Sequence, residues 1–290
     1  MSGAPWPAPA KLNLFLHVVG RRPDGYHELQ TAFQLLDLAD ELEFELRDDG
    51  RLQRLAGPAE VEPDHDLSLR AARLLQASTG TPLGADIRVH KRIPVGGGLG
   101  GGSSDAATTL VALNALWGTG LSPTQLAALG LGLGADVPVF VHGHSAWAEG
   151  VGECLTPLEL PERWFAVIRP RVAVATAEVF QAPELTRNSP RITIRGFLEA
   201  GGRNDCEPVV AARWPEVGSA LAWLGRAGEA RLTGTGSCVF AAFTSAAAAL
   251  AALTDLPAGW QGYLARGLAR SPLLERLAAA GAGRVDDCSA

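Results

Sequence analysis

The sequence predicts an α/β protein of the α+β type, divided into two domains. The 290-residue chain is longer than a single hydrophobic core usually serves. Segments with strand alternation and segments with helical periodicity follow one another along the chain. The Pro- and charge-rich stretch "LTPLELPER" at 155–163 separates two such series. We therefore expect an N-terminal domain at 1–157 and a C-terminal domain at 158–290.

Apolar alternation predicts the first strands. The segment "KLNLFLHVVG" at 11–20 alternates leucines with other residues and is followed by the turn sequence "RPDG". "ELEFELR" at 41–47 alternates again and ends at "DDG". "LSLRAARLLQ" at 67–76 has the apolar spacing of a helix, and "ADIRVHKRI" at 85–93 that of a strand. This last strand leads into a loop made mostly of glycine.

A helix is predicted after the glycine loop, because four apolar residues share one helical face: Ala106, Leu110, Leu113 and Trp117. Ser103 or Ser104 is placed to cap its start, and Gly118 to end it. "SPTQLAALGLGLG" at 122–134 predicts a short helix with Ser122 as its cap. "ADVPVFVHG" at 135–143 is expected to form a strand or a buried turn.

The second half continues the alternation of strands and helices. Three strands are expected at 164–170, 191–194 and 237–243. Helical stretches are expected at 205–224, 245–254 and 273–280. No internal repeat is visible, so a second α+β domain is the simplest interpretation.

The composition excludes several classes of protein. A 47% apolar and 19% charged chain is typical of a globular protein, and a net charge of −6 argues against nucleic acid or a membrane as the main partner. The four cysteines are spread out without a C-x-x-C pair, so we expect reduced thiols at Cys154, Cys206, Cys238 and Cys288. No signal peptide or 18-residue apolar run is visible, which favours the cytoplasm.

The glycine loop "PVGGGLGGGSS" is the strongest candidate for a binding site. Backbone amides without neighbouring Cβ atoms, followed by a helix N-terminus, suit phosphate oxygens. The predicted cradle comprises Pro94, Val95, Gly96, Gly97, Gly98, Leu99, Gly100, Gly101, Gly102, Ser103 and Ser104.

Alternative roles for this loop stay open. It matches G-x-G-x-x-G, but it lies roughly 80 residues past the first predicted strand, where a Rossmann motif is not expected. It also lacks the lysine of a Walker A motif. A glycine-rich hairpin or a tight packing corner would use the same residues.

Further polar residues are candidates for chemistry. Lys11 and Asn13 are two apart on a strand and share a face, so they can orient a hydroxyl and stabilise phosphoryl charge. Asp136 lies in apolar sequence and either caps backbone amides or acts as a general base. Tyr26 and His27 either clamp a flat ring or pack at a strand entry. "TGTG" at 233–236 is either a second loop over a ligand or a simple turn.

Together these segments resemble one family, the GHMP kinases. The resemblance covers nearly the whole chain and is carried by five stretches, at 9–31, 94–110, 133–143, 203–208 and 232–240. Within the family, "DGYHEL" together with "RNDCEP" is similar to the members that act on cytidyl-diphospho-methylerythritol.

The resemblance implies a GHMP kinase fold, with an ATP-binding N-terminal domain like ribosomal protein S5 domain 2 and a ferredoxin-like C-terminal domain. It implies ATP-dependent phosphorylation of the 2-hydroxyl of that small-molecule substrate. Asp136 would take the hydroxyl proton while Lys11 holds and polarises the oxygen, and the glycine loop would hold the ATP phosphates. Mg²⁺ is the expected metal; since no ligand cage is visible, we expect a hydrated ion held mostly by phosphates.

The resemblance also implies a substrate pocket. Tyr26 and His27 would bind the cytidine moiety, Asn13 would lie near the substrate hydroxyls, and Thr176 and Phe180 would complete the wall.

Two positions depart from the family pattern. Relatives often carry asparagine at Asp66, and some do at Asp105, both on the expected adenine side. An ionised aspartate only accepts hydrogen bonds, so the adenine contacts at these two positions stay open.

Three alternative functions share parts of this pattern. A sibling kinase for homoserine, mevalonate or a sugar would share the fold. A dinucleotide-binding oxidoreductase would use the G-x-G-x-x-G match, and a catalytically silent ligand-binding relative would not need both Lys11 and Asp136. A monomer or homodimer is expected.

Overall fold

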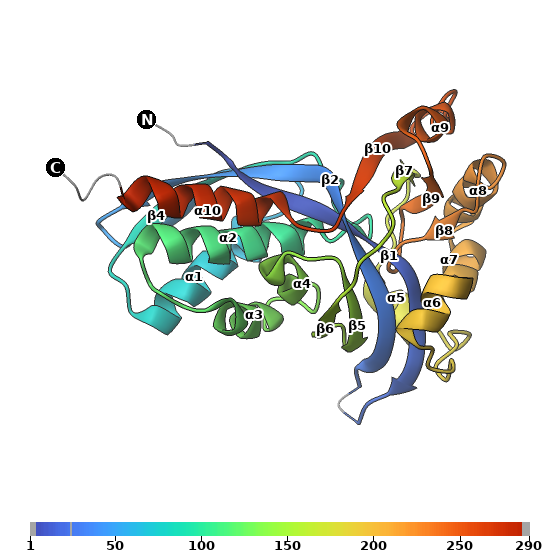
Figure 1. Cartoon of the computed structure of the whole chain (residues 1–290), viewed down its shortest axis with the longest axis horizontal. Helices are drawn as coiled ribbons and strands as arrows, with labels where there is room; N and C mark the ends of the chain where they lie inside the picture. The colour runs from blue at the N-terminus through green and yellow to red at the C-terminus, as the bar shows by residue number, and fades with distance from the viewer. Residues whose placement is uncertain (1–3, 24, 286–290) are drawn as a thin grey trace.

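The computed structural model describes residues 4–23 and 25–285. Two long antiparallel strands, β1 (Trp6–Arg21) and β2 (His27–Arg47), run through the molecule and join its two halves (Figure 1). β2 pairs with strands of both halves, namely β4 and β5 of the first and β10 of the second. The two halves therefore share one continuous ten-stranded sheet.

The first half contains helices α1 to α4 and the strands around them. Along the chain these are β3 (Leu52–Ala56), a 3-10 turn η1 (Pro63–His65), α1 (Leu67–Thr79), β4 (Gly84–His90), α2 (Gly101–Trp117), α3 (Pro123–Leu131), α4 (Val137–His142), β5 (Ala146–Gly150) and β6 (Cys154–Pro157). Their shared core includes the fully buried Leu110 and Phe140.

The second half alternates short strands and helices. In order these are β7 (Trp164–Arg169), α5 (Thr176–Gln181), α6 (Ile194–Ala200), α7 (Glu207–Arg213), α8 (Pro215–Leu224), β8 (Arg231–Leu232), β9 (Val239–Phe243), α9 (Ala246–Ala251) and β10 (Gln261–Leu268). Its core is built around Val210 and Val239, and the strand order through the sheet is β3-β4-β2-β10-β7-β9-β8.

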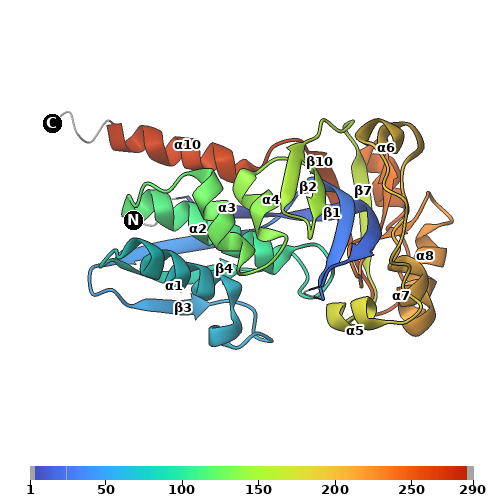
Figure 2. The ribbon, with the colours of Figure 1, turned by 90° about the horizontal axis from the view of Figure 1, so that it is seen from below.

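The last helix, α10 (Pro272–Val285), returns to the first half and runs along it (Figure 2). It contacts β1 and α2, and its Leu273 belongs to the first core. The domain division at 157/158 stays a prediction. The structure shows that α10, at the C-terminal end, packs on the N-terminal half.

Most of the expected elements are confirmed. Strands cover 11–20, 41–47, most of 85–93 and of 164–170, and the β9 part of 237–243. Helices cover most of each predicted helical stretch, and Ser122 forms a full capping box at α3. The stretch 205–224 is divided at Trp214 into α7 and α8, and α10 continues beyond the predicted end at 280 to Val285. The sequence did not predict β3, β5, β6, β8, β10, α5 or α6. β3 pairs parallel to β4, and β5 and β10 are placed by pairing with β2, a long-range contact that local sequence does not specify.

Three local predictions are wrong. The segment 135–143 contains α4 in place of a strand or turn, because Pro138 fits the first turn of a helix and the apolar residues that follow are all buried. The segment 191–194 forms no strand, because the Thr193 hydroxyl caps α6 by accepting from Gly196 N–H.

The third error concerns the start of α2. The predicted serine caps lie inside the first turn of the helix, and the cap position is held by Gly100 in the left-handed conformation, φ 73°.

Cys154, Cys206 and Cys238 are free thiols, and Cys288 lies outside the described residues. Within residues 4–23 and 25–285, no helix has both the length and the apolar character needed to cross a membrane.

Candidate active site

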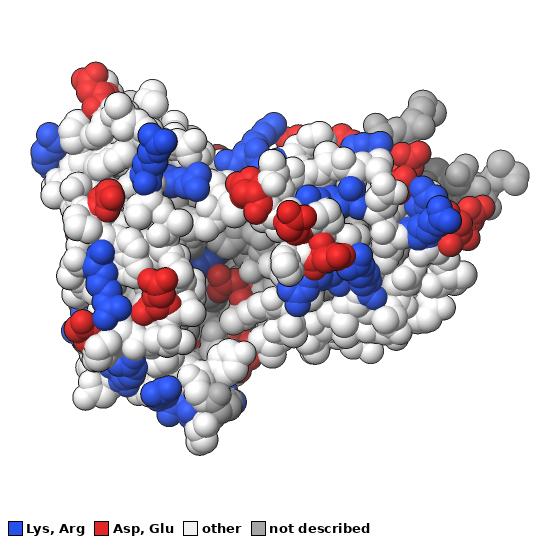
Figure 3. All heavy atoms as spheres, turned by 180° about the vertical axis from the view of Figure 1, so that it is seen from behind, with Lys and Arg blue, Asp and Glu red and all other residues white. Residues whose placement is uncertain are grey.

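A cleft of about 1160 Å³ lies between the two halves, and Figure 3 shows it as a deep hollow. It is lined by the glycine loop, β1, the first residues of β2, the start of α4, and α5 with residues 234–235 from the second half. All the predicted site residues line it except Ser104, whose hydroxyl is buried without a partner among the described residues. Segments far apart in sequence therefore meet here.

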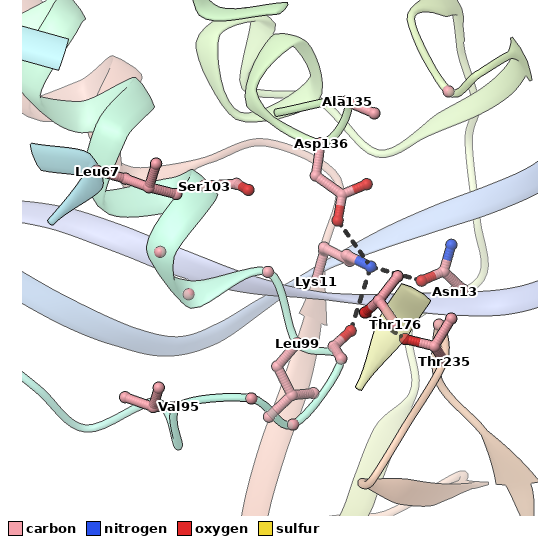
Figure 4. Close-up of a pocket in the computed structure, with 18 of the residues that line it drawn as sticks. Lys11, Asn13, Leu67, Val95, Leu99, Ser103, Ala135, Asp136, Thr176 and Thr235 are labelled. Atoms are coloured by element: carbon pink, nitrogen blue, oxygen red, sulfur yellow. Dashed lines mark hydrogen bonds and ion pairs between the residues drawn. The ribbon is translucent and has the colours of Figure 1, made fainter. Parts of the chain in front are cut away.

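Lys11 lies at the centre of the cleft, on an irregular part of β1. The register with β2 shifts between Pro9 and Lys11, and the Lys11 backbone N–H donates to Leu99 O of the glycine loop at 3.0 Å. Its ammonium group donates to Asn13 Oδ1 at 2.5 Å and to Gly98 O at 3.2 Å (Figure 4). The expectation that Lys11 and Asn13 lie side by side is confirmed.

Asp136 occupies the N-cap position of α4, but its carboxylate makes no capping hydrogen bond. Its Oδ2 lies 3.2 Å from Lys11 Nζ, and its side chain keeps 32% of its surface exposed toward the cleft. The sequence left two roles open for Asp136, a cap of backbone amides or a general base, and the structure shows no cap. The carboxylate therefore keeps lone pairs that can accept a hydrogen bond from a ligand in the cleft.

Asn13 links the lysine to both halves of the molecule. Its Nδ2 donates to Thr31 Oγ1 on β2 at 3.0 Å, and its backbone N–H donates to Thr233 Oγ1 at 3.0 Å. Thr31 in turn donates to Phe15 O. Lys11, Asn13 and Thr31 thus form a buried hydrogen-bond network in which the side-chain polar atoms have partners. The Lys11 ammonium group is held by Asn13, Gly98 and Asp136.

The glycine loop serves two purposes. A Cβ on Gly98 would lie 2.4 Å from Thr233 O, and one on Gly97 would lie 2.6 Å from Cys238 Sγ. This part is a tight packing corner against residues 233–238, one of the alternatives that the sequence left open. The other part enters α2, where the Gly100 cap provides no side chain and the first amides of the helix have no helical acceptor. These amides are the ones suited to an anion.

The second glycine loop, residues 232–236, is held by Asn204 of the "RNDCEP" stretch. The Asn204 amide donates to Leu232 O at 2.9 Å and to Gly234 O at 2.8 Å, and accepts from Cys206 N–H at 2.9 Å. Thr235 then meets Thr176 of α5, with 2.9 Å between their hydroxyl oxygens. The sequence analysis did not assign this role to Asn204, and its only signal was its place in the "RNDCEP" stretch.

Aromatic and basic residues form the other end of the cleft. The His27 ring stacks on Phe180 with centroids 5.1 Å apart and 24° between planes. Arg187, which the sequence did not single out, donates through Nε to His27 Nε2 at 3.1 Å. Burial first, then the charges of Arg187 and Arg21, lower the pKa of His27 from its usual value of 6.5. Tyr26 is 65% exposed beside them.

A second lysine, Lys91, was also missed. It directly follows β4 and donates to Asp40 Oδ2 at 2.5 Å and to Asp105 Oδ2 at 2.7 Å. Burial, with a further contribution from Asp40, raises the pKa of Asp105 to about 7, although Lys91 acts in the opposite direction. Asp105 Oδ1 has no hydrogen-bond partner in the described part of the chain. The pairing of β2 with β4 brings Asp40 to Lys91, and α2 supplies Asp105.

Asp66 is the other position that departs from the family pattern, and both of its carboxylate oxygens accept hydrogen bonds. Its carboxylate accepts from Ser68 N–H at the start of α1 and pairs with Arg54 at 2.7 Å. Among the residues described, no group of three or more His, Cys, Asp or Glu side chains is placed to hold a metal ion.

The amino-acid sequence is also similar to known protein families and to named proteins. The model for the GHMP kinases N terminal domain matches residues 66–144, and the model for the GHMP kinases C terminal matches residues 185–261. A protein of Alkalilimnicola ehrlichii named 4-diphosphocytidyl-2-C-methyl-D-erythritol kinase is 64% identical over 272 residues, which cover 94% of each chain.

Solved structures give the same result. A crystal structure of 4-(cytidine 5'-diphospho)-2C-methyl-D-erythritol kinase superposes with a TM-score of 0.80 at 37% identity, covering 92% of this chain and 99% of that one. Homoserine kinase from Cytophaga hutchinsonii shares the fold with a TM-score of 0.68 at 17% identity, covering 93% and 95% of the two chains. The chain therefore belongs to the GHMP kinase family, in its 4-diphosphocytidyl-2-C-methyl-D-erythritol kinase branch.

Proposed function

We infer that this protein phosphorylates the 2-hydroxyl of 4-diphosphocytidyl-2-C-methyl-D-erythritol with ATP. One observation supports the reaction above the others: Lys11 and Asp136 meet at 3.2 Å in the cleft, between the glycine loop and the His27–Phe180 pair. A base and a cation thus lie between a phosphate-binding surface and a surface for a flat ring. The names of the high-identity relatives supply the acceptor.

In this mechanism the substrate hydroxyl lies against Lys11 and Asp136. The hydroxyl proton moves to the Asp136 carboxylate while the oxygen attacks the γ-phosphorus of ATP. The bond between that phosphorus and the β–γ bridging oxygen breaks, and ADP leaves with the bond electrons. Lys11 stabilises the negative charge on the oxygen, so catalysis depends on position and positive potential.

The glycine loop and the first amides of α2 hold the phosphates of ATP in this proposal. Mg²⁺ would supply further positive charge when bound. Because the described residues provide no carboxylate or histidine cage, we propose that the ion is held mostly by phosphate and water. The predicted division makes residues 1–157 the ATP-binding domain and residues 158–290 the second wall of the cleft.

A panel of acceptors tests the proposal. The purified protein would be offered ATP and Mg²⁺ with the cytidyl substrate, homoserine, mevalonate and a sugar in separate reactions. We expect turnover with the cytidyl substrate alone; phosphorylation of mevalonate or homoserine in its place would overturn the assignment.

Thermal unfolding with ATP or with NAD(H) separates a kinase from an oxidoreductase, since only a ligand of the folded state stabilises it. A cytoplasmic location and a monomeric or homodimeric state remain predictions, and light scattering would measure the latter.

A further inference from the structure

Arg187 lies behind the ring-binding end of the cleft, where its guanidinium donates four hydrogen bonds. Its Nη2 donates to Phe180 O at 2.8 Å and to Ala182 O at 2.7 Å, at the end of α5. Its Nη1 donates to Leu185 O at 3.0 Å, and its Nε donates to His27 Nε2. One guanidinium therefore joins the two aromatic residues that stack on each other.

The contact with His27 determines where the imidazole proton lies. An arginine side chain has only donors, so the nitrogen that faces it must offer a lone pair. A neutral imidazole with a lone pair on Nε2 carries its proton on Nδ1. The charges that face this ring are those of Arg187, on the segment after α5, and of Arg21, on β1, and both oppose a second proton.

We propose that Arg187 is a positioning residue that holds His27 as the Nδ1–H tautomer, parallel to Phe180, and thereby makes the cleft selective for a cytosine base. The inference rests on the proposed function. Nδ1–H donates a hydrogen bond, and cytosine presents an acceptor at ring nitrogen N3 where uracil presents an N–H donor. With Nδ1 protonated, His27 matches the first base and opposes the second.

The tautomer can be measured on the protein without substrate. Selective ¹⁵N labelling of histidine, with His27→Gln to assign the signal, distinguishes the protonated from the unprotonated ring nitrogen. Above pH 6.5, the usual pKa of histidine, we expect Nδ1 to carry the proton and Nε2 to be free of it. A proton on Nε2 would overturn the proposal, whatever the protein phosphorylates.

Kinetics test the consequence for selectivity. In Arg187→Met we expect KM for the cytidyl substrate to rise on the order of tenfold, because a charge-assisted hydrogen bond is lost. We expect kcat and the KM for ATP to change by less than about twofold, since the Lys11–Asp136 end is untouched. The preference for the cytidyl substrate over its uridyl analogue should fall by a similar factor.

Two further variants make the result decisive. Arg187→Lys keeps a cationic donor for Nε2, and we expect it to retain the tautomer and most of the preference, even if the methionine variant does not fold. Arg195→Met removes an exposed arginine that pairs with Glu199 on α6, its one ion-pair partner in the described part of the chain, and we expect it to change neither constant. An unchanged base preference in Arg187→Met would refute the proposal. Absence of turnover with the cytidyl substrate in the wild type would instead refute the proposed function.

Discussion

Two lysines line the same cleft in different settings. Lys11 pairs with one carboxylate, Asp136, whose side chain is 32% exposed, and its other partners are neutral oxygens. Lys91 lies between two carboxylates, Asp40 and Asp105, whose side chains are 0% and 6% exposed. The same residue types thus form an open pair and a closed triad.

The two settings differ in how many hydrogen-bond acceptor positions of the carboxylates remain free. Asp40 Oδ1 already accepts from the backbone N–H groups of Arg92 and Ile93, so the triad joins β2, the end of β4 and α2 into a fixed frame. Asp136 retains free lone pairs at the cleft, so it can accept a proton from a ligand. Burial and the number of partners, more than residue identity, distinguish the structural triad from the pair that we propose to be reactive.

The largest expected effect follows from breaking the closed triad. Lys91→Met would leave two carboxylates without their cation in the protein interior. We expect a loss of about 3–5 kcal/mol in the free energy of unfolding at about pH 8, measured by urea unfolding. Adding Asp105→Asn should restore part of this loss, because one buried charge is removed. A loss below about 1 kcal/mol would mean that the triad behaves like a surface pair.

A substitution in the open Lys11–Asp136 pair should change the catalytic activity. Asp136→Asn keeps the shape of the side chain and removes its basicity, so we expect turnover to fall on the order of 10²-fold or more. Folding should be retained, because the carboxylate caps no helix amide. Steady-state rates measured together with thermal unfolding would check both statements. A variant with wild-type turnover would remove Asp136 from the reaction.

A smaller effect concerns pH. The pKa of Asp105 is raised in the folded protein to about 7 from an ordinary value near 3.8, so the folded state binds this proton more tightly than the unfolded state does. The contribution of Asp105 to stability is therefore complete below pH 3.8 and is lost as the pH rises to about 7. Asp105→Asn should remove this decline from the pH dependence of the unfolding free energy. Parallel curves for variant and wild type would contradict the assignment.

An exposed ion pair provides the smallest effect. Arg73 and Asp64 lie 3.0 Å apart, but their side chains are 50% and 81% exposed. We expect Arg73→Ala to change the free energy of unfolding by less than about 1 kcal/mol, because water and salt screen the pair. Urea unfolding under the conditions used for Lys91→Met gives the comparison. A similar loss in both variants would show that burial is not the deciding factor.

Sequence patterns predicted the elements whose periodicity is local. The alternation at Leu12, Leu14 and Leu16 identified β1, and the motifs identified the glycine loop and the Lys11–Asn13 pair. They did not reveal Lys91 or Arg187, because those roles depend on pairing between distant strands and on a loop that returns to His27.

The error at α4 has a different cause. "VPVFV" is apolar on every side, and a fully buried helix gives no periodic signal to separate it from a strand. Asp136 as a possible cap and Pro138 in the first turn were the local signs of a helix start.

The helix α10 has a consequence for how the protein is made. It fills the first core with Leu273, and its Arg276 donates to Ala4 O at 3.0 Å and stacks over Trp6 at 4.5 Å. During synthesis, Leu273 leaves the ribosome after every other buried residue of that core. The first core therefore lacks one of its buried residues for as long as the second half is being translated. The core that begins at Trp6 can be completed only once Leu273 has been added, near the opposite end of the chain.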